Sequence, residues 1–314
     1  PLDVRLLEND GSGNFKDITN LVAEAFLKIG MTRDAAIADF DGDGDLEIIL
    51  VGEWMPIRFF KKVNGKYEDL SEKFGLSNTG GLWNTIQVLD LNNDGKLDFI
   101  AGNMGLNTRL NALENKPMQL YVNDFDQNGS VEQILTQYEG EVSFPLVLKG
   151  PLLKQLPSLR KQLLNYDAYK DKTMEKLFPM EILERSVVHE VHTLESKLFL
   201  NTDDGVFETA SLPSLVQSSP VYSIFAEKEN TDQWEILFAG NQSKIKPEIG
   251  INMGSFGWMF RGKDEKNLDL IPTQKSGFFV EGEVRDIKRI KTKQGYKFIV
   301  VRNNQSMLIL DKQQ

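Results

Sequence analysis

Short apolar runs separated by turns rich in Gly, Asn and Asp dominate the hydrophobic pattern of this chain. Three segments repeat one arrangement: an apolar run, a turn containing Asn-Gly, Asp-Gly or Gly, an aromatic residue and an acidic or polar tail. They span residues 6–19, 59–71 and 198–210. Asn-Gly and Asp-Gly turns between alternating apolar residues are the strongest local signal for a β-hairpin. The pattern therefore predicts an all-β fold.

A second repeated segment is acidic and contains Gly at its sixth position. It occurs at residues 39–47, 90–98 and 124–132, and an apolar run follows each copy. Many short strands with a repeat of tens of residues favour a closed repeat, because a lone four-stranded unit cannot bury its faces. We predict a β-propeller of four-stranded blades, with residues 1–314 forming one propeller domain or a large part of one. The third copy follows the second too soon for a full blade, so we expect it in a different hairpin of its blade.

Two later segments are interpreted as blades whose acidic loop has lost its pattern. One is the loop at 227–235, which is expected to hold no metal, and the other runs from Val284 to Val301. Leucines near helical spacing in 152–178 predict two short helices inserted into a blade. The mixed charge of this insertion favours a solvated cap or a partner surface over a core element.

The amino-acid composition argues against several classes of function. The chain has 36 basic and 46 acidic residues, a net charge of −10, which argues against a nucleic-acid binder. It has no Cys and two His, so cysteine chemistry and a three-histidine metal centre are excluded and carboxylates are the main metal ligands available. No apolar run approaches the ~20 residues of a membrane span, and the chain opens at Pro1 without an initiator Met or signal peptide. We interpret it as a soluble fragment or a processed product.

The three acidic segments are predicted to be calcium loops. Side-chain oxygens at positions 1, 3, 5 and 9, a backbone carbonyl at position 7 and Gly at position 6 resemble the first half of an EF-hand loop. The expected ligands are Asp39, Asp41, Asp43, Asp45 and Glu47 in the first loop, Asp90, Asn92, Asp94, Lys96 and Asp98 in the second, and Asp124, Asp126, Asn128, Ser130 and Glu132 in the third.

The choice of calcium follows from the ligand set. Closely spaced carboxylates repel one another unless a hard cation neutralises them. Oxygen ligands in a flexible loop favour Ca²⁺ over Mg²⁺ and over zinc. A helical EF-hand is rejected, because position 12 is Leu50, Ala101 or Leu135 within an apolar run. A plain Asp/Asn-Gly turn remains the alternative.

These loops resemble the FG-GAP or VCBS repeats of integrin-α-like propellers, in which Ca²⁺ closes a hairpin within a blade. Residues 54–56, 101–107, 156–159 and 276–278 are further similar to bacterial VCBS-repeat proteins joined to an ASPIC/UnbV domain. The resemblance implies calcium binding and an extracellular, cell-surface or periplasmic location. It also implies a non-catalytic binding or scaffold module for protein or carbohydrate.

A propeller enzyme acting on polysaccharide, a lyase or glycosidase, is the alternative function, because a single sequence does not show which acids pair in space. His189 and His192 lack zinc-protease spacing and lie in a segment that favours a strand. Propellers bind ligands with the loops of one face. The candidate partner-binding residues are therefore Trp54, Met55, Trp83, Asn103, Asn107 and Arg109, although both tryptophans could instead pack between blades.

Overall fold

The computed structural model describes residues 3–228, 232–246, 249–293 and 295–311. The chain divides into two compact units. The main unit comprises Pro1–Thr108, Leu194–Ile245 and Ile251–Gln314, and the inserted unit comprises Arg109–Thr193 and Lys246–Gly250. Within the described ranges, none of the helices has the length and apolar character needed to cross a membrane.

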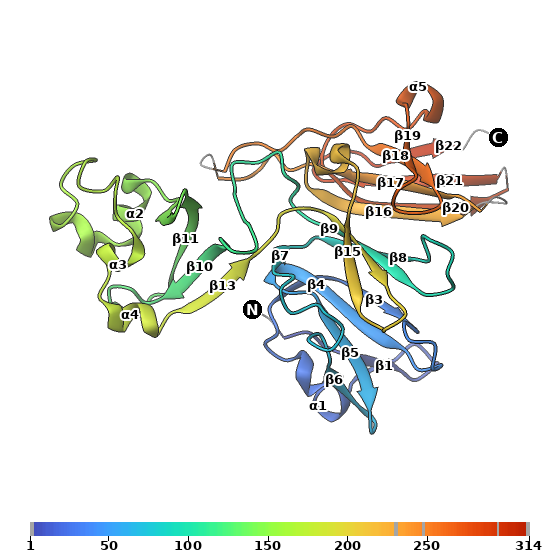
Figure 1. Cartoon of the computed structure of the whole chain (residues 1–314), viewed down its shortest axis with the longest axis horizontal. Coiled ribbons are helices and arrows are strands. Elements are labelled where there is room, and N and C mark those ends of the chain that lie inside the picture. The colour runs from blue at the N-terminus through green and yellow to red at the C-terminus, as the bar shows by residue number, and fades with distance from the viewer. Residues whose placement is uncertain (1–2, 229–231, 247–248, 294, 312–314) are drawn as a thin grey trace. The chain divides into compact units, whose positions relative to one another are not determined.

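Besides a two-stranded sheet near the start of the chain, the described part of the main unit contains four antiparallel sheets, which we call sheets I to IV (Figure 1). Sheet I is β3 (Met31–Ala38), β4 (Glu47–Met55), β5 (Arg58–Val63) and β6 (Lys66–Asp69), with the short β7 (Gly81–Leu82) paired to β4. Sheet II is β8 (Thr85–Leu89), β9 (Asp98–Gly102), β14 (Lys197–Asn201) and β15 (Phe207–Ser211). Sheet III is β16 (Val221–Lys228), β17 (Trp234–Gly240), β18 (Trp258–Gly262) and β19 (Leu268–Ile271). Sheet IV is β20 (Val284–Thr292), β21 (Gly295–Arg302) and β22 (Leu308–Asp311).

The predicted all-β class is confirmed, and so are the three predicted hairpins. Residues 6–19 form β1 (Leu7–Asn9) and β2 (Phe15–Asp17), and the other two segments form β5–β6 and β14–β15. At the Asn64-Gly65 turn both residues have positive φ, 50° and 82°, as a two-residue hairpin turn requires. Some of the connections in the described part of the main unit contain short helical segments, which are α1 (Thr19–Val22), η1 (Glu24–Phe26), η3 (Ser214–Ser218) and α5 (Thr273–Ser276).

The first strands of the four sheets contact one another in chain order. β3 contacts β8, β8 contacts β16, and β16 contacts β20. Apolar side chains fill the spaces between successive sheets. Phe59 and Phe99 pack between sheets I and II, and Ile224 and Phe238 pack between sheets II and III. Each sheet therefore covers one face of the next, as the burial argument for repeated four-stranded units requires.

Three of these first strands carry a β-bulge near the start of the strand. The register shifts between Thr32 and Asp34 in β3, between Val221 and Ser223 in β16, and between Val284 and Asp286 in β20. The bulged residues of the three strands lie together: the guanidinium carbons of Arg33 and Arg285 are 5.9 and 4.1 Å from the centre of the Tyr222 ring. Bulges re-aim side chains, and here they bring three strands of three sheets to one point.

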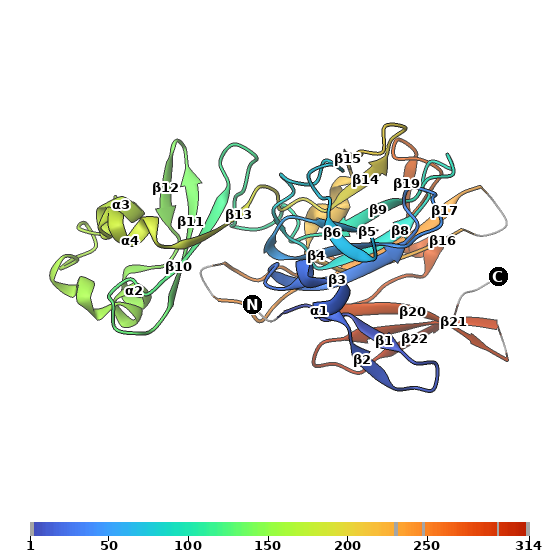
Figure 2. The same cartoon turned by 90° about the horizontal axis from the view of Figure 1, so that it is seen from below.

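The inserted unit has a four-stranded sheet of its own in the order β12-β11-β10-β13. The strands are β10 (Met118–Asn123), β11 (Glu132–Glu139), β12 (Val142–Pro145) and β13 (Val187–Val191). Its helices are α2 (Lys149–Gln155), η2 (Pro157–Lys161), α3 (Met174–Leu177) and α4 (Met180–Glu184), which lie together beside the sheet in both views (Figures 1 and 2).

The helical segment is part of a core, which corrects the interpretation as a solvated cap. Leu152, Leu156 and Leu163 are buried and pack with Phe125 and Ile134 of the sheet side. The charged residues Lys154, Arg160 and Lys161 are exposed, whereas the buried leucines pack toward the sheet. The helical region also extends beyond 152–178, from Lys149 to Glu184.

The inserted unit interrupts sheet II. Its main segment lies between β9 and β14, which pair with each other through Phe99 and Phe199. Leu194 on the return side accepts a 2.8 Å hydrogen bond from the Gly105 N–H on the outgoing side. The third acidic loop belongs to this unit, so its short spacing from the second loop marks an insertion.

Candidate metal centres

The three acidic segments are connections between paired strands. The first joins β3 to β4, the second joins β8 to β9, and both join the first two strands of their sheets. The third joins β10 to β11 at the middle of the inserted sheet. We call them loop 1, loop 2 and loop 3.

The backbones of the three loops have the same left-handed residues. At position 6 the φ angles of Gly44, Gly95 and Gly129 are 90°, 87° and 89°. Position 4 is also left-handed in each loop, at Gly42 (73°), Asn93 (59°) and Gln127 (57°). Glycine avoids the Cβ clash of this conformation, and the recurrence explains why the sixth position is Gly in every copy.

The first and fifth positions organise each loop through carboxylate or amide oxygens. Asp39, Asp90 and Asp124 each accept the N–H of the position-6 glycine at 3.0, 3.1 and 2.8 Å. The position-5 oxygens accept the N–H of position 7, with donors Asp45, Lys96 and Ser130 at 2.9, 2.9 and 2.8 Å. Ligation by the position-7 carbonyls stays a prediction.

The ninth position closes each loop from within. Glu47 and Asp98 are fully buried and Glu132 is 5 % exposed. Each accepts the backbone N–H of position 2 of its own loop at 2.8, 3.0 and 3.1 Å, respectively. A buried carboxylate requires such donors or a cation to offset its lost hydration.

Loop 1 gathers the most charge. The Lys61 ammonium of β5 donates to Asp41 and, at 2.6 Å, to Asp43, and it lies 3.6 Å from Glu47 Oε1. That oxygen is buried and has no hydrogen-bond donor in the described part of the chain. Burial raises the pKa of Glu47, and the negative charges of Asp41 and Asp43 add to the effect.

Loop 2 has a weaker acidic set, since Asn92 takes the place of an acid and donates to Asp94 at 2.9 Å. Burial raises the pKa of Asp98 to about 6, and the charges of Asp94 and Asp90 add to this. The buried Asn201 joins loops 1 and 2, because its N–H donates to Asp98 at 2.9 Å and its side-chain amide donates to the Phe40 carbonyl at 2.8 Å.

The acids converge in loops 1 and 3. Oxygens of Asp39, Asp41 and Asp43 all lie within 4.8 Å of one another, and so do those of Asp124, Asp126 and Glu132. Asp126 Oδ1 is buried and, like Glu47 Oε1, has no hydrogen-bond donor among the residues that the structure describes. The three acids of loop 2 do not form such a group within those residues.

The candidate partner-binding residues separate into two groups. Three of them are buried in the main unit: Met55, Trp83 and Asn103 are 2 %, 0 % and 0 % exposed. The alternative that Trp83 packs in the interior is therefore confirmed. Trp54 is partly exposed and has a left-handed φ of 59°, which is rare for a bulky residue. Asn107 and Arg109 are exposed.

The loop predicted to have lost its ligand set lies partly outside the described residues, because 229–231 are not described. Its described end packs on loop 2, where the Trp234 indole N–H donates to the Asp90 carbonyl at 2.8 Å. Lys61 and Asn201, which both contact the loops, were not indicated by any sequence signal. The His189 region is strand β13, as predicted.

Comparison with known families agrees with this repeated geometry. Residues 2–50 and 39–101 each match the profile of the FG-GAP-like repeat. The chain carries FG-GAP-like repeats. The two matches overlap at loop 1 and together take in loop 2, so the FG-GAP-like repeats coincide with sheet I and the first half of sheet II. A search of curated proteins gave no match.

Proposed function

We propose that this chain is a calcium-stabilised β-propeller module that binds or scaffolds a protein or carbohydrate ligand and has no catalytic role. The observation that carries the proposal is the recurrence of one loop conformation, with a buried carboxylate at position 9, at three places in the chain. The FG-GAP-like repeats and the row of contacting first strands support a propeller.

The loop residues fit a hard divalent cation. Glu47 Oε1 and Asp126 Oδ1 are buried oxygens without a hydrogen-bond donor in the described ranges. Asp126 belongs to the acidic group of loop 3, and the Lys61 ammonium lies 3.6 Å from Glu47 Oε1 in loop 1. A metal ion would supply the missing partner of Asp126, would replace the Lys61 ammonium beside the loop 1 acids, and would offset the repulsion between neighbouring carboxylates. Loop 1 would hold it with Asp39, Asp41, Asp43 and Glu47, and loop 3 with Asp124, Asp126, Asn128 and Glu132.

Calcium is the proposed cation because the donors are oxygens in a flexible loop, an arrangement that Ca²⁺ accepts more readily than Mg²⁺. Loops of modest affinity would be filled at the millimolar calcium found outside cells. We therefore place the module in an extracellular, cell-surface or periplasmic setting. Once bound, calcium would act as a structural tie between strands, and the ligand would meet the loops of one propeller face.

The test is thermal unfolding in EGTA, in excess Ca²⁺ and in the same concentration of Mg²⁺. A ligand that binds only the native state stabilises it by RT ln(1 + [L]/Kd), so Ca²⁺ should raise the melting temperature and Mg²⁺ should raise it weakly. Asp41→Ala should reduce the calcium response, whereas Glu72→Ala, a change at an exposed acid outside the loops, should leave it intact. Identical curves in EGTA and calcium would refute the proposal.

The alternative, an enzyme acting on polysaccharide, is separated by a carbohydrate screen in which turnover is measured beside binding. Binding without turnover supports the module. Release of shortened or unsaturated sugars would establish the enzyme.

A further inference from the structure

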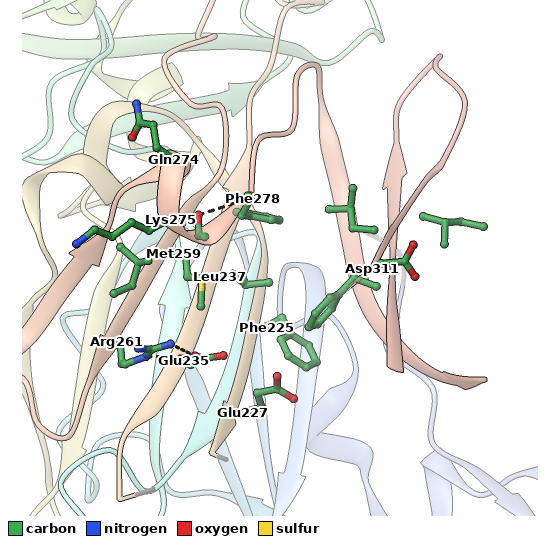
Figure 3. A pocket seen from close by; sticks show the side chains of 16 residues that line it. Phe225, Glu227, Glu235, Leu237, Met259, Arg261, Gln274, Lys275, Phe278 and Asp311 are labelled. Carbon is green, nitrogen blue, oxygen red and sulfur yellow. Dashed lines mark hydrogen bonds and ion pairs between the residues drawn. The ribbon is translucent and has the colours of Figure 1, made fainter. Parts of the chain in front are cut away.

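A cavity of about 530 Å³ lies between sheets III and IV of the main unit (Figure 3). Its lining combines apolar and polar side chains. The apolar residues include Phe225, Leu237 and Met259 of sheet III and Phe298 and Leu310 of sheet IV, and charged side chains lie around them. Sites for small molecules have volumes of roughly 300–1,000 Å³ and mostly apolar walls. The cavity therefore has the size of a ligand site, and its apolar residues are accompanied by charged groups that could orient a ligand.

Comparison with sheets I and II explains why this space is open. There the fourth strand of sheet II, β15, supplies Phe207, whose ring lies 5.0–6.3 Å from the rings of Phe40, Phe59, Phe74 and Phe99. Sheet IV has three strands in the described part of the chain. No fourth strand within those residues brings a ring into the corresponding space.

One of the charged residues that line the cavity has no ion-pair partner within the described ranges. Glu235 pairs with Arg261, Glu227 with Arg289, and Asp311 with Lys297 at 2.7 Å. The remaining charged residue of the lining is Lys275 of α5, which has no ion-pair partner among the residues that the structure describes. Figure 3 shows Lys275 above and the Arg261–Glu235 pair below Met259, on one side of the cavity, with Asp311 on the opposite side.

We propose that this cavity binds a small amphipathic anion, with an apolar body between the two sheets and a carboxylate head at Lys275. The apolar middle excludes water from the body of the ligand, which supplies the binding free energy. The head stays at the end where the unpaired cation projects. The three ion pairs of the lining satisfy their own charges, so they leave Lys275 to select the sign of the ligand.

Octanoate is the probe, and 1-octanol, which shares its apolar body, is the neutral comparison. With calcium present throughout, titration calorimetry should show octanoate binding more tightly than 1-octanol. Lys275→Met should weaken octanoate about fivefold, the size of one exposed ion pair, and should leave 1-octanol unchanged. Lys291→Met, at an exposed lysine of β20 that does not line the cavity, is the matched control and should change neither.

Blocking the cavity tests its location. Leu310 on β22 lines the cavity and packs with Phe298 on the face of sheet IV that is turned toward sheet III, so Leu310→Trp adds a ring inside the cavity. This variant should bind neither probe while its far-ultraviolet spectrum stays that of the parent. Equal binding of octanoate and 1-octanol, or unchanged octanoate binding by Lys275→Met, would overturn the carboxylate head. Unchanged binding by a folded Leu310→Trp variant would overturn the site itself.

Discussion

At the scale of single residues, Lys61 occupies the position among the loop 1 acids where the proposed cation would lie. Its side chain is 18 % exposed and its ammonium faces Asp41, Asp43 and Glu47. Lys61→Met should lower the melting temperature in EGTA, because the three acids lose their counter-ion. The same variant should bind Ca²⁺ several-fold more tightly at loop 1, since no ammonium competes with the metal. Titration calorimetry of both forms measures this, and weaker calcium binding by the variant would contradict it.

A second residue-scale prediction concerns Glu283, which is 6 % exposed. Its carboxylate accepts hydrogen bonds from the N–H and hydroxyl of Ser243 and from Asn303, and it pairs with Arg285 at 2.9 Å. Burial opposes the charged form, but these partners outweigh it and lower the pKa of Glu283 from 4.5 to about 2.

The sign of the pH dependence follows from that direction. A depressed carboxyl pKa adds stability above pH ~4.5, and this stability is lost as the pH falls toward 2. The loss is at most about 3 kcal/mol, from 1.36 kcal/mol per pKa unit. Urea unfolding from pH 6 to pH 3 should show a smaller decline for Glu283→Gln than for the parent, and parallel declines would exclude a role for this carboxylate.

At the scale of elements, a glycine near the end of a strand allows close packing between strands. A Cβ placed on Gly240 of β17 would lie 1.7 Å from the Pro220 carbonyl oxygen. Because the neighbour is backbone, it cannot swing aside, and Gly240→Ala should destabilise the main unit by about 3 kcal/mol.

Gly150 of helix α2 is the matched control, since a Cβ there has nothing within 4 Å. Gly150→Ala should change the stability of the inserted unit by less than about 0.5 kcal/mol, because the gain in helix propensity is opposed by crowding of the new Cβ against the ring of Pro151. Hydrogen exchange read by mass spectrometry resolves peptides of the two units. Similar exchange in the Gly240→Ala variant and the parent would show that the strand ends can separate without cost.

At the scale of the whole molecule, the loops are divided between the two units: loops 1 and 2 belong to the main unit and loop 3 to the inserted unit. Calcium should therefore stabilise each unit separately. Asp39→Ala should reduce the calcium protection of main-unit peptides, and Asp124→Ala should reduce only that of the inserted unit, again by hydrogen exchange. If either change reduces the protection of both units equally, the loops do not act locally.

The features that could be predicted from the sequence are those determined by a few neighbouring residues. Turn residues with positive φ, such as Asn64 and Gly95, indicated the hairpins and the acidic loops, because the constraint lies within a few residues. The sequence did not predict the partner of β9, since Phe99 pairs with Phe199 across an entire inserted unit and such pairing depends on no local signal. The bulges at Arg33, Tyr222 and Arg285 and the cavity between sheets III and IV are likewise products of long-range packing.

Because the inserted unit separates β9 from β14 in the chain, the two paired strands of sheet II are synthesised at different times. During synthesis at 5–20 residues per second, β9 emerges about 5–20 s before the strand that pairs with its outer edge. For that interval the apolar strand at 98–102 has an unpaired edge, the kind of surface on which chains join one another. An inserted unit with its own core can fold within the same interval and bring the two sides of sheet II together, so the speed at which it folds should govern how much of the nascent chain escapes aggregation.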